Sequence, residues 1–195
     1  TSPDVQERVL TAAKEIGYVH KAAVMKQVPT GKNRVIGFGG RVLDDSLPKY
    51  LNSPETVVFN KRQTLFGLAK AGKYIKEKNQ ALIVEGYMDV ISLHQAGVFG
   101  AVASMGTALA QPQIERLLQL NPILTLSFDG DSAGQKAAWR AMEIGLPALS
   151  DGKELRFLTL PDNHDPDSYV SAHGAIAMQQ QMQQAAPLSE YLYSS

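Results

Sequence analysis

The chain has 195 residues, of which 44% are hydrophobic and 19% charged, as is typical of a globular protein with one well-formed core. It contains no run of about 18 apolar residues, no signal-peptide pattern and no cysteine. These features argue against a membrane protein, a disulfide-held secreted protein and a thiolate zinc site, and we expect a cytoplasmic protein. The net charge is zero, but residues 1–78 carry 14 Lys and Arg against 7 Asp and Glu, and residues 79–195 carry 5 against 12. The basic part indicates a polyanionic partner and the acidic part cations, unless the two parts only neutralise each other.

The first 78 residues are predicted to form a helix and then short, irregular strands. Thr1 to Asp4 provides an N-cap with proline at the first helical position, apolar residues recur at helical spacing, and Gly17 ends the helix. A strand entering a glycine-rich bend is predicted for residues 34–41, and a helix for residues 64–78.

From residue 79 the pattern changes to an alternation of strands and helices, which is typical of a mostly parallel sheet covered by helices. The predicted strands are residues 81–85, 101–104, 123–128 and 154–160. The predicted helices are residues 88–96, 111–120, 133–149 and 175–186. The sequence therefore predicts an α/β fold with a four-stranded sheet.

Acidic residues follow the predicted strands at the point where each strand ends. They are Glu85 and, one helical turn later, Asp89; Asp129 and Asp131; and Asp165 and Asp167. Ligands of open α/β sheets bind at the carboxyl ends of the strands, so these side chains are expected to share one edge. Packed carboxylates repel one another and Mg²⁺ prefers carboxylate oxygens, so the pattern predicts a magnesium site, with glycines such as Gly134 allowing close backbone approach.

Each acidic pair also has a simpler interpretation when it is taken alone. Asp129-Gly130-Asp131 is more often a turn or a helix cap than a metal site, and Asp165 is a good N-cap. The common edge is what favours the metal.

Residues 34–192 resemble the RNA polymerase core of bacterial DnaG-type primases. The resemblance is carried, in order, by RVIGFGGR (34–41), PKYLNSPET (48–56), VEGYMDV (84–90), FDGDSAG (128–134), AAWRA (137–141) and HDPD (164–167). It implies a Toprim fold, a small α/β sheet with flanking helices, preceded by a small basic α+β subdomain. The implied division is residues 34–78 for the basic subdomain, 79–170 for the Toprim module and 171–195 for the start of a helical subdomain.

The resemblance also implies roles for single residues. Glu85, Asp129 and Asp131 would be catalytic metal ligands, with Asp89, Asp165 and Asp167 as further acidic site residues. Arg41, Lys49, Asn52 and Lys61 match the positions that handle template and nucleotide, although an exposed lysine is more often only a solubilising charge.

The activity implied by the resemblance is synthesis of short RNA primers on single-stranded DNA. The expected cofactor is Mg²⁺, with Mn²⁺ as a substitute, and the partners are single-stranded DNA, ribonucleoside triphosphates and the RNA–DNA hybrid product. Replicative helicase would bind the full-length family member but not this part of it, and neither a zinc site nor a membrane is expected. A Toprim nuclease or topoisomerase, and a non-catalytic single-stranded DNA-binding fragment, remain alternatives.

Residues 1–33 are interpreted as not primase-like. Residues 1–18 resemble the third helix of lactose-repressor-type DNA-binding domains, and residues 30–38 resemble the hinge and first strand that follow it. The recognition helix of such a domain would lie upstream of Thr1, so operator recognition is not expected.

Overall fold

The computed structural model describes residues 35–41, 50–129, 132–161 and 164–194. The chain divides into two compact units, Thr1–Phe59 and Asn60–Ser195. The predicted first helix and tail, the loop that contains Lys49, and Asp131 lie outside the described residues.

The first unit contains a short antiparallel hairpin of β1 (Gly39–Arg41) and β2 (Tyr50–Asn52). Its pairing continues at Phe38 and Ser53: the Phe38 N–H donates to Ser53 Oγ, and the Ser53 N–H donates to the Phe38 carbonyl, both at 2.9 Å. The strand predicted for residues 34–41 is therefore shorter than expected, since residues 35–38 have no regular secondary structure.

The second unit is built on a five-stranded sheet with the order β4-β3-β5-β6-β7. The first four strands are parallel to one another: β3 (Leu82–Val84), β4 (Ala101–Ala103), β5 (Ile123–Ser127) and β6 (Glu154–Leu158). The short β7 (Ala186–Pro187) pairs antiparallel with β6. Proline is tolerated there because β7 is an edge strand.

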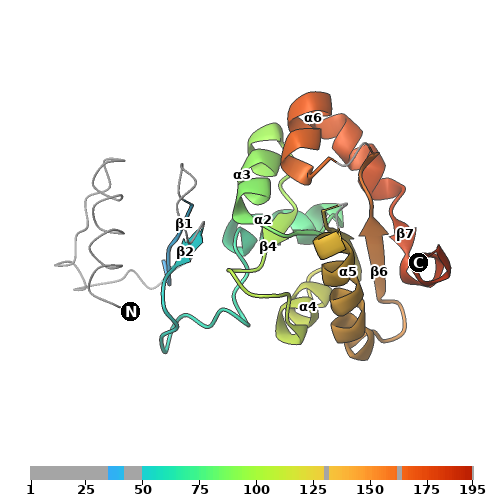
Figure 1. Cartoon of the computed structure of the whole chain (residues 1–195). Coiled ribbons are helices and arrows are strands. Elements are labelled where there is room, and N and C mark those ends of the chain that lie inside the picture. The colour runs from blue at the N-terminus through green and yellow to red at the C-terminus, as the bar shows by residue number, and fades with distance from the viewer. Residues whose placement is uncertain (1–34, 42–49, 130–131, 162–163, 195) are drawn as a thin grey trace. The chain divides into compact units, whose positions relative to one another are not determined.

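Helices cover both faces of this sheet, so the unit has three layers (Figure 1). One face carries the buried residues of α2 (Leu68–Lys78), α4 (Gln111–Leu118) and α5 (Ser132–Gly145). The other face carries those of α3 (Tyr87–Ala96) and α6 (Pro166–Gln183). A 3-10 turn, η1 (Leu146–Ala148), follows α5, and α7 (Leu188–Ser194) ends the chain.

The strands read as continuous apolar runs because both faces are buried. Ile83 of β3 packs with the first set of helices, and its neighbours Leu82 and Val84 pack with the second. In α2, Leu68, Ala71 and Ile75 are buried at helical spacing, and the helix is capped at its C-terminus by Asn79, which adopts a left-handed φ of 53°. Successive side chains of β3 thus enter the cores on opposite faces of the sheet, and the buried residues of α2 belong to the core on the face that Ile83 enters.

Several element boundaries differ from those predicted. The last long helix begins at Pro166 rather than at residue 175 and contains non-helical backbone at Gly174. Asp165 caps it at its N-terminus, and Ala186, predicted as the last residue of that helix, pairs instead with β6, together with Pro187. The sheet gains its fifth strand in this way.

The division into domains also differs from the prediction. The second compact unit begins at Asn60, not at residue 79, because Ala71 and Ile75 of α2 are buried in the same core as Ile83 and Leu126. The predicted boundary at residues 170 and 171 falls inside α6, which packs on the sheet. Among the described residues, no helix is both long and apolar enough to cross a membrane.

Candidate active site

Glu85 and Asp129 meet at the carboxyl edge of the sheet. Glu85 directly follows β3, Asp129 lies two residues after β5, and the two strands are neighbours with Ile83 opposite Leu126. The Asp129 N–H donates to Glu85 Oε1 at 3.0 Å. The backbone of one strand end therefore orients the carboxylate of the other.

Asp89 lies in the first turn of α3, just beyond Glu85. Its Oδ2 accepts a hydrogen bond from the Gly86 N–H at 3.1 Å, so the carboxylate is folded back towards the start of the helix. Burial raises the pKa of Asp89 to about 6; the Gly86 hydrogen bond opposes this, and the charges of Asp165, Asp129 and Asp167 add to it. The effect of these three charges on Asp89 shows that the carboxylates occupy one region.

Asp165 and Asp167 reach this region from the start of α6. Asp165 Oδ1 accepts from the Ser168 N–H at 2.7 Å, and the Asp165 N–H donates to Ser168 Oγ at 3.1 Å. This reciprocal cap fixes the first turn of α6, and buried residues of α6 and α3 share one core cluster. Asp165 thus forms the predicted N-cap, and its charge also acts on Asp89.

The structure brings Glu85, Asp89, Asp129, Asp165 and Asp167 to the edge predicted from the sequence. Within the residues that the structure describes, no three His, Asp or Glu side chains are close enough together to hold a metal ion. The donor set still suits a hard cation, because it consists of carboxylates; burial, and after it the neighbouring negative charges, raises the pKa of Asp89.

In a chelator, Asp89→Asn is expected to be more stable than the wild type above pH 6. Because the folded-state pKa of Asp89 is raised to about 6, its stability contribution is complete below the ordinary pKa of 3.8 and is lost as the pH rises through 6. We expect a difference of about 1–2 kcal/mol at pH 7.5, reduced by partial exposure of the carboxyl, and little difference at pH 4. Urea unfolding at both pH values measures it. Asp151→Asn, in an exposed turn before β6, is the control, and equal pH profiles of Asp89→Asn and the wild type would contradict the prediction.

Gly134, in the first turn of α5, packs directly against the backbone of Asp129. A Cβ on Gly134 would collide with the Asp129 carbonyl oxygen and would lie 2.7 Å from its carbonyl carbon and 2.8 Å from its nitrogen. The prediction that Gly134 allows close backbone approach is confirmed. This contact sets how closely α5 can follow the end of β5.

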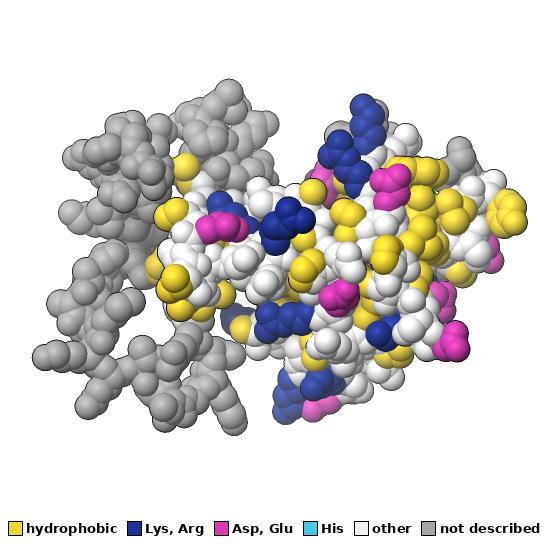
Figure 2. Space-filling view, turned by 90° about the horizontal axis from the view of Figure 1, so that it is seen from below, with side chains coloured by type: hydrophobic (Ala, Val, Ile, Leu, Met, Phe, Trp, Pro, Cys, Tyr) yellow, Lys and Arg dark blue, Asp and Glu magenta, His cyan; other side chains and the backbone are white. Residues whose placement is uncertain are grey.

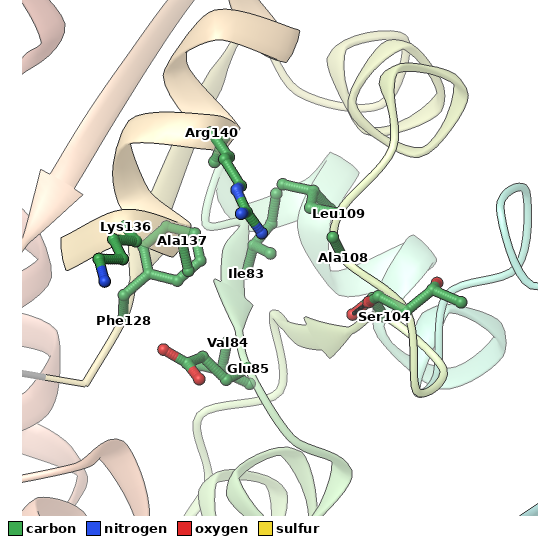
Figure 3. Close-up of a pocket in the computed structure, with 12 residues that line it drawn as sticks. Ile83, Val84, Glu85, Ser104, Ala108, Leu109, Phe128, Lys136, Ala137 and Arg140 are labelled. Carbon is green, nitrogen blue, oxygen red and sulfur yellow. Dashed lines mark hydrogen bonds between the residues drawn. The ribbon is translucent and has the colours of Figure 1, made fainter. Parts of the chain in front are cut away.

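A pocket of about 290 Å³ opens beside Glu85, on the side of the sheet covered by α5 (Figure 3). Its floor is apolar and includes Ile83 and Phe128, and α5 contributes Lys136 and Arg140. In Figure 3 the Arg140 side chain extends from α5 towards Ile83, while the Glu85 carboxylate lies near Phe128. Sequence reasoning missed these two cations; their spacing of four residues on a predicted helix was the available signal.

The residues predicted to contact template and nucleotide lie in both units. Arg41 and Asn52 are in the β1–β2 hairpin of the first unit, although not opposite each other, since Arg41 pairs with Tyr50. Asn52 Oδ1 is buried and accepts no hydrogen bond from the described residues. Lys61 is half-buried in a turn at the start of the second unit.

Basic side chains appear in several separate groups on the face shown in Figure 2, interleaved with neutral and hydrophobic atoms. A strand of nucleic acid can be held by such spaced charges, because each neutralises phosphates locally. Because these groups are separate, the described surface on this face has no single continuous basic patch.

Two family profiles match the chain. A Toprim-like profile matches residues 82–170, and a profile of the N-terminal domain of the DNA primase catalytic core matches residues 6–72. The second match crosses the predicted boundary at residue 33, so it differs from the interpretation of residues 1–33 as not primase-like. Those residues lie outside the described part of the chain.

Curated and solved relatives agree with these profiles. The DNA primase of Pseudomonas aeruginosa is 52% identical over 171 residues, which are 87% of this chain and 26% of that protein. The structure of the Escherichia coli primase catalytic core matches with a TM-score of 0.77 at 50% identity, over 83% of this chain and 51% of that one. A DnaG primase catalytic domain bound to single-stranded DNA matches with the same TM-score at 49% identity, again over 83% and 51%. The chain thus spans about a quarter of the curated relative and about half of the solved cores.

Proposed function

The chain belongs to the DnaG-type DNA primase family and spans part of its catalytic core, and from this membership we propose that it carries the nucleotide-joining centre of a primase. The reaction is transfer of a nucleotidyl group from a ribonucleoside triphosphate to the 3′-hydroxyl of a growing RNA, with release of pyrophosphate, on a single-stranded DNA template. The observation that carries the proposal is the hydrogen bond that joins Asp129 to Glu85 at the carboxyl edge of the sheet, where the charges of Asp165, Asp129 and Asp167 also act on Asp89.

Glu85, Asp129 and Asp131 are the residues proposed to hold Mg²⁺, or Mn²⁺ in its place, with Asp89, Asp165 and Asp167 around them. When bound, the ion would neutralise negative charge on the triphosphate and favour ionisation of the attacking hydroxyl. The protein's own part is positioning: the Asp129 N–H orients the Glu85 carboxylate, and the Gly86 N–H holds Asp89 near the start of α3. Such preorganised groups need no rearrangement when the reaction begins.

Phosphate groups of template and nucleotide would be bound by the basic residues. We assign this role to Arg41, Lys49 and Lys61, and assign Asn52 to a hydrogen bond with template or nucleotide. The buried Asn52 Oδ1, which has no partner among the described residues, supports its assignment, because such an acceptor is costly to leave unsatisfied. The matching domain solved with single-stranded DNA supports the choice of partner. The product would be an RNA–DNA hybrid, formed at a cytoplasmic replication fork where helicase contacts other parts of the full-length protein.

Primer synthesis by the 195-residue chain tests the proposal. The chain is incubated with single-stranded DNA, labelled ribonucleoside triphosphates and Mg²⁺ or Mn²⁺, and the products are resolved by length. Short products that are sensitive to ribonuclease and depend on the DNA are expected. Cleavage of the DNA would instead favour a Toprim nuclease, and tight binding of single strands without synthesis would favour a non-catalytic fragment.

Binding of single-stranded DNA is expected to weaken steeply with salt. Each neutralised phosphate contributes about −0.7 to the slope of log K against log salt concentration, so three contacts give a loss of about tenfold or more between 50 and 200 mM. Lys61→Met should reduce the slope by about 0.7 in a fluorescence anisotropy titration. Lys153→Met, at the amino end of β6, is the control and should keep the wild-type slope. A salt-independent affinity would contradict an electrostatic interface.

A further inference from the structure

Gln113 is a fully buried polar residue that the proposed mechanism does not use. It lies in the first turn of α4, and its side chain is 0% exposed. Its Oε1 accepts a hydrogen bond from the Ala110 N–H at 2.9 Å. Its Nε2 donates to the carbonyl oxygens of Lys61 at 3.0 Å and Thr64 at 2.7 Å. The partners fix the orientation of the amide, since its nitrogen faces two acceptors and its oxygen faces a donor.

These bonds attach α4 to the turn that carries Lys61. Within the turn, the Asn60 carbonyl accepts from the N–H groups of Gln63 at 3.1 Å and Thr64 at 2.9 Å, and Asn60 Oδ1 accepts from the Arg62 N–H at 2.9 Å. The turn is thus closed internally by Asn60 and held from outside by Gln113. Leu65 next to it is buried, whereas Arg62 and Gln63 are exposed.

Capping of α4 explains half of this arrangement. A cap needs the acceptor Oε1 on the Ala110 N–H, and any side chain with an oxygen at that position provides it. The two bonds donated by Nε2 add nothing to the helix end, because both acceptors are about 50 residues earlier in the chain. One of those acceptors is the backbone of Lys61 itself, so the bond limits where the Lys61 side chain can begin.

We propose that Gln113 is a positioning residue for nucleic-acid binding, because it fixes the backbone from which Lys61 reaches a phosphate of the template or nucleotide. This rests on the proposed function, in which Lys61 contacts phosphate. A lysine on a fixed backbone loses less conformational freedom on binding than one on a loose turn, so the anchor raises affinity without touching the ligand.

Two substitutions separate the anchor from the cap. Gln113→Glu keeps an oxygen for the Ala110 N–H but removes both donors, and Gln113→Met removes the amide without burying a carboxyl group. The matched control is Gln111→Glu: Gln111 is exposed on the same helix and its Nε2 donates to Glu115 at 2.8 Å. Lys61→Met and the double variant Gln113→Glu with Lys61→Met complete the set.

Binding of a fluorescent oligo-dT of about 16 nucleotides to the whole chain is measured over a range of salt concentrations. Both Gln113 variants are expected to raise Kd about 3- to 10-fold and to lower the salt slope by about 0.7, as Lys61→Met does, with no change for Gln111→Glu. In primer synthesis, KM for the template rises while kcat stays within about twofold. The double variant should be no weaker than Lys61→Met, because Gln113 acts through Lys61.

A purely structural role would give a different result. The melting temperature and the active fraction would fall, the salt slope of the remaining folded protein would stay at the wild-type value, and the effects of the two substitutions would multiply. If Lys61→Met behaves as expected and the Gln113 variants keep the wild-type slope, the positioning role alone is contradicted. If the wild-type chain neither binds single strands nor makes primer, the proposed function is contradicted and the positioning role with it.

Discussion

Glu85→Gln is expected to lower the rate of primer synthesis by about two to three orders of magnitude. The substitution removes one negative charge from the edge where the proposed metal would be held, and amide oxygens bind Mg²⁺ more weakly than carboxylates do. The fold should survive, because Glu85 is exposed and glutamine retains an oxygen for the Asp129 N–H, the bond seen at 3.0 Å.

The rate is measured as incorporation of labelled ribonucleotide at several Mg²⁺ concentrations, with urea unfolding as a check on the fold. Glu77→Gln is the matched control, since Glu77 is an exposed carboxylate on α2 whose partner is Lys73 at 3.7 Å. Such a surface pair contributes little, so this variant should keep the wild-type rate and stability. Incorporation by Glu85→Gln at more than a tenth of the wild-type rate would contradict the role of Glu85.

Gly134→Ala is expected to destabilise the chain by about 1–3 kcal/mol and to reduce primer synthesis at least tenfold. The added methyl group collides with the backbone of Asp129, which is rigid, rather than with the end of a flexible side chain. Either α5 or the segment after β5 must move, and the second movement breaks the bond from the Asp129 N–H to Glu85. Stability and activity should therefore fall together.

The control for this substitution is Gly72→Ala in α2, another glycine inside a helix. There a Cβ would have Leu120 at 3.9 Å and Leu68 at 4.0 Å as its nearest neighbours, which is ordinary contact. Alanine is favoured over glycine in a helix interior, so Gly72→Ala should stabilise the chain by about 0.5–1 kcal/mol and leave synthesis unchanged. If Gly134→Ala also stabilises the chain, the close approach of α5 to Asp129 is not a constraint.

The sequence predicted the α/β class and the edge of the sheet where the acidic residues lie. Apolar runs such as residues 123–127 are buried on both faces, and the residues that follow them leave the sheet at its carboxyl edge. Glu85 and Asp129 could be predicted to share this edge because each directly follows an apolar run, and such a run can be recognised from neighbouring residues alone. The extent of α6 and the β7 edge strand were not predictable from periodicity, because a kink at Gly174 and pairing with β6 override local preference there.

Lys136, Arg140 and Gln113 show the same limit at the level of single residues. Each lies on a predicted helix, and although the four-residue spacing places Lys136 and Arg140 on one helix face, residue order does not show what surrounds any of the three. Their surroundings come from other elements: the pocket beside Glu85 for the two cations, and a turn about 50 residues away for Gln113.

The sequence by itself therefore determined which carboxylates end the strands and which family the motifs resemble, because these depend on residue order and local periodicity. The tertiary structure alone decided that β5 pairs with β3 in the sheet, which places Asp129 beside Glu85. It also decided that α6 brings Asp165 and Asp167 towards Asp89. It also decided that the pKa of Asp89 rises to about 6, because burial and like charges act through space and not along the chain.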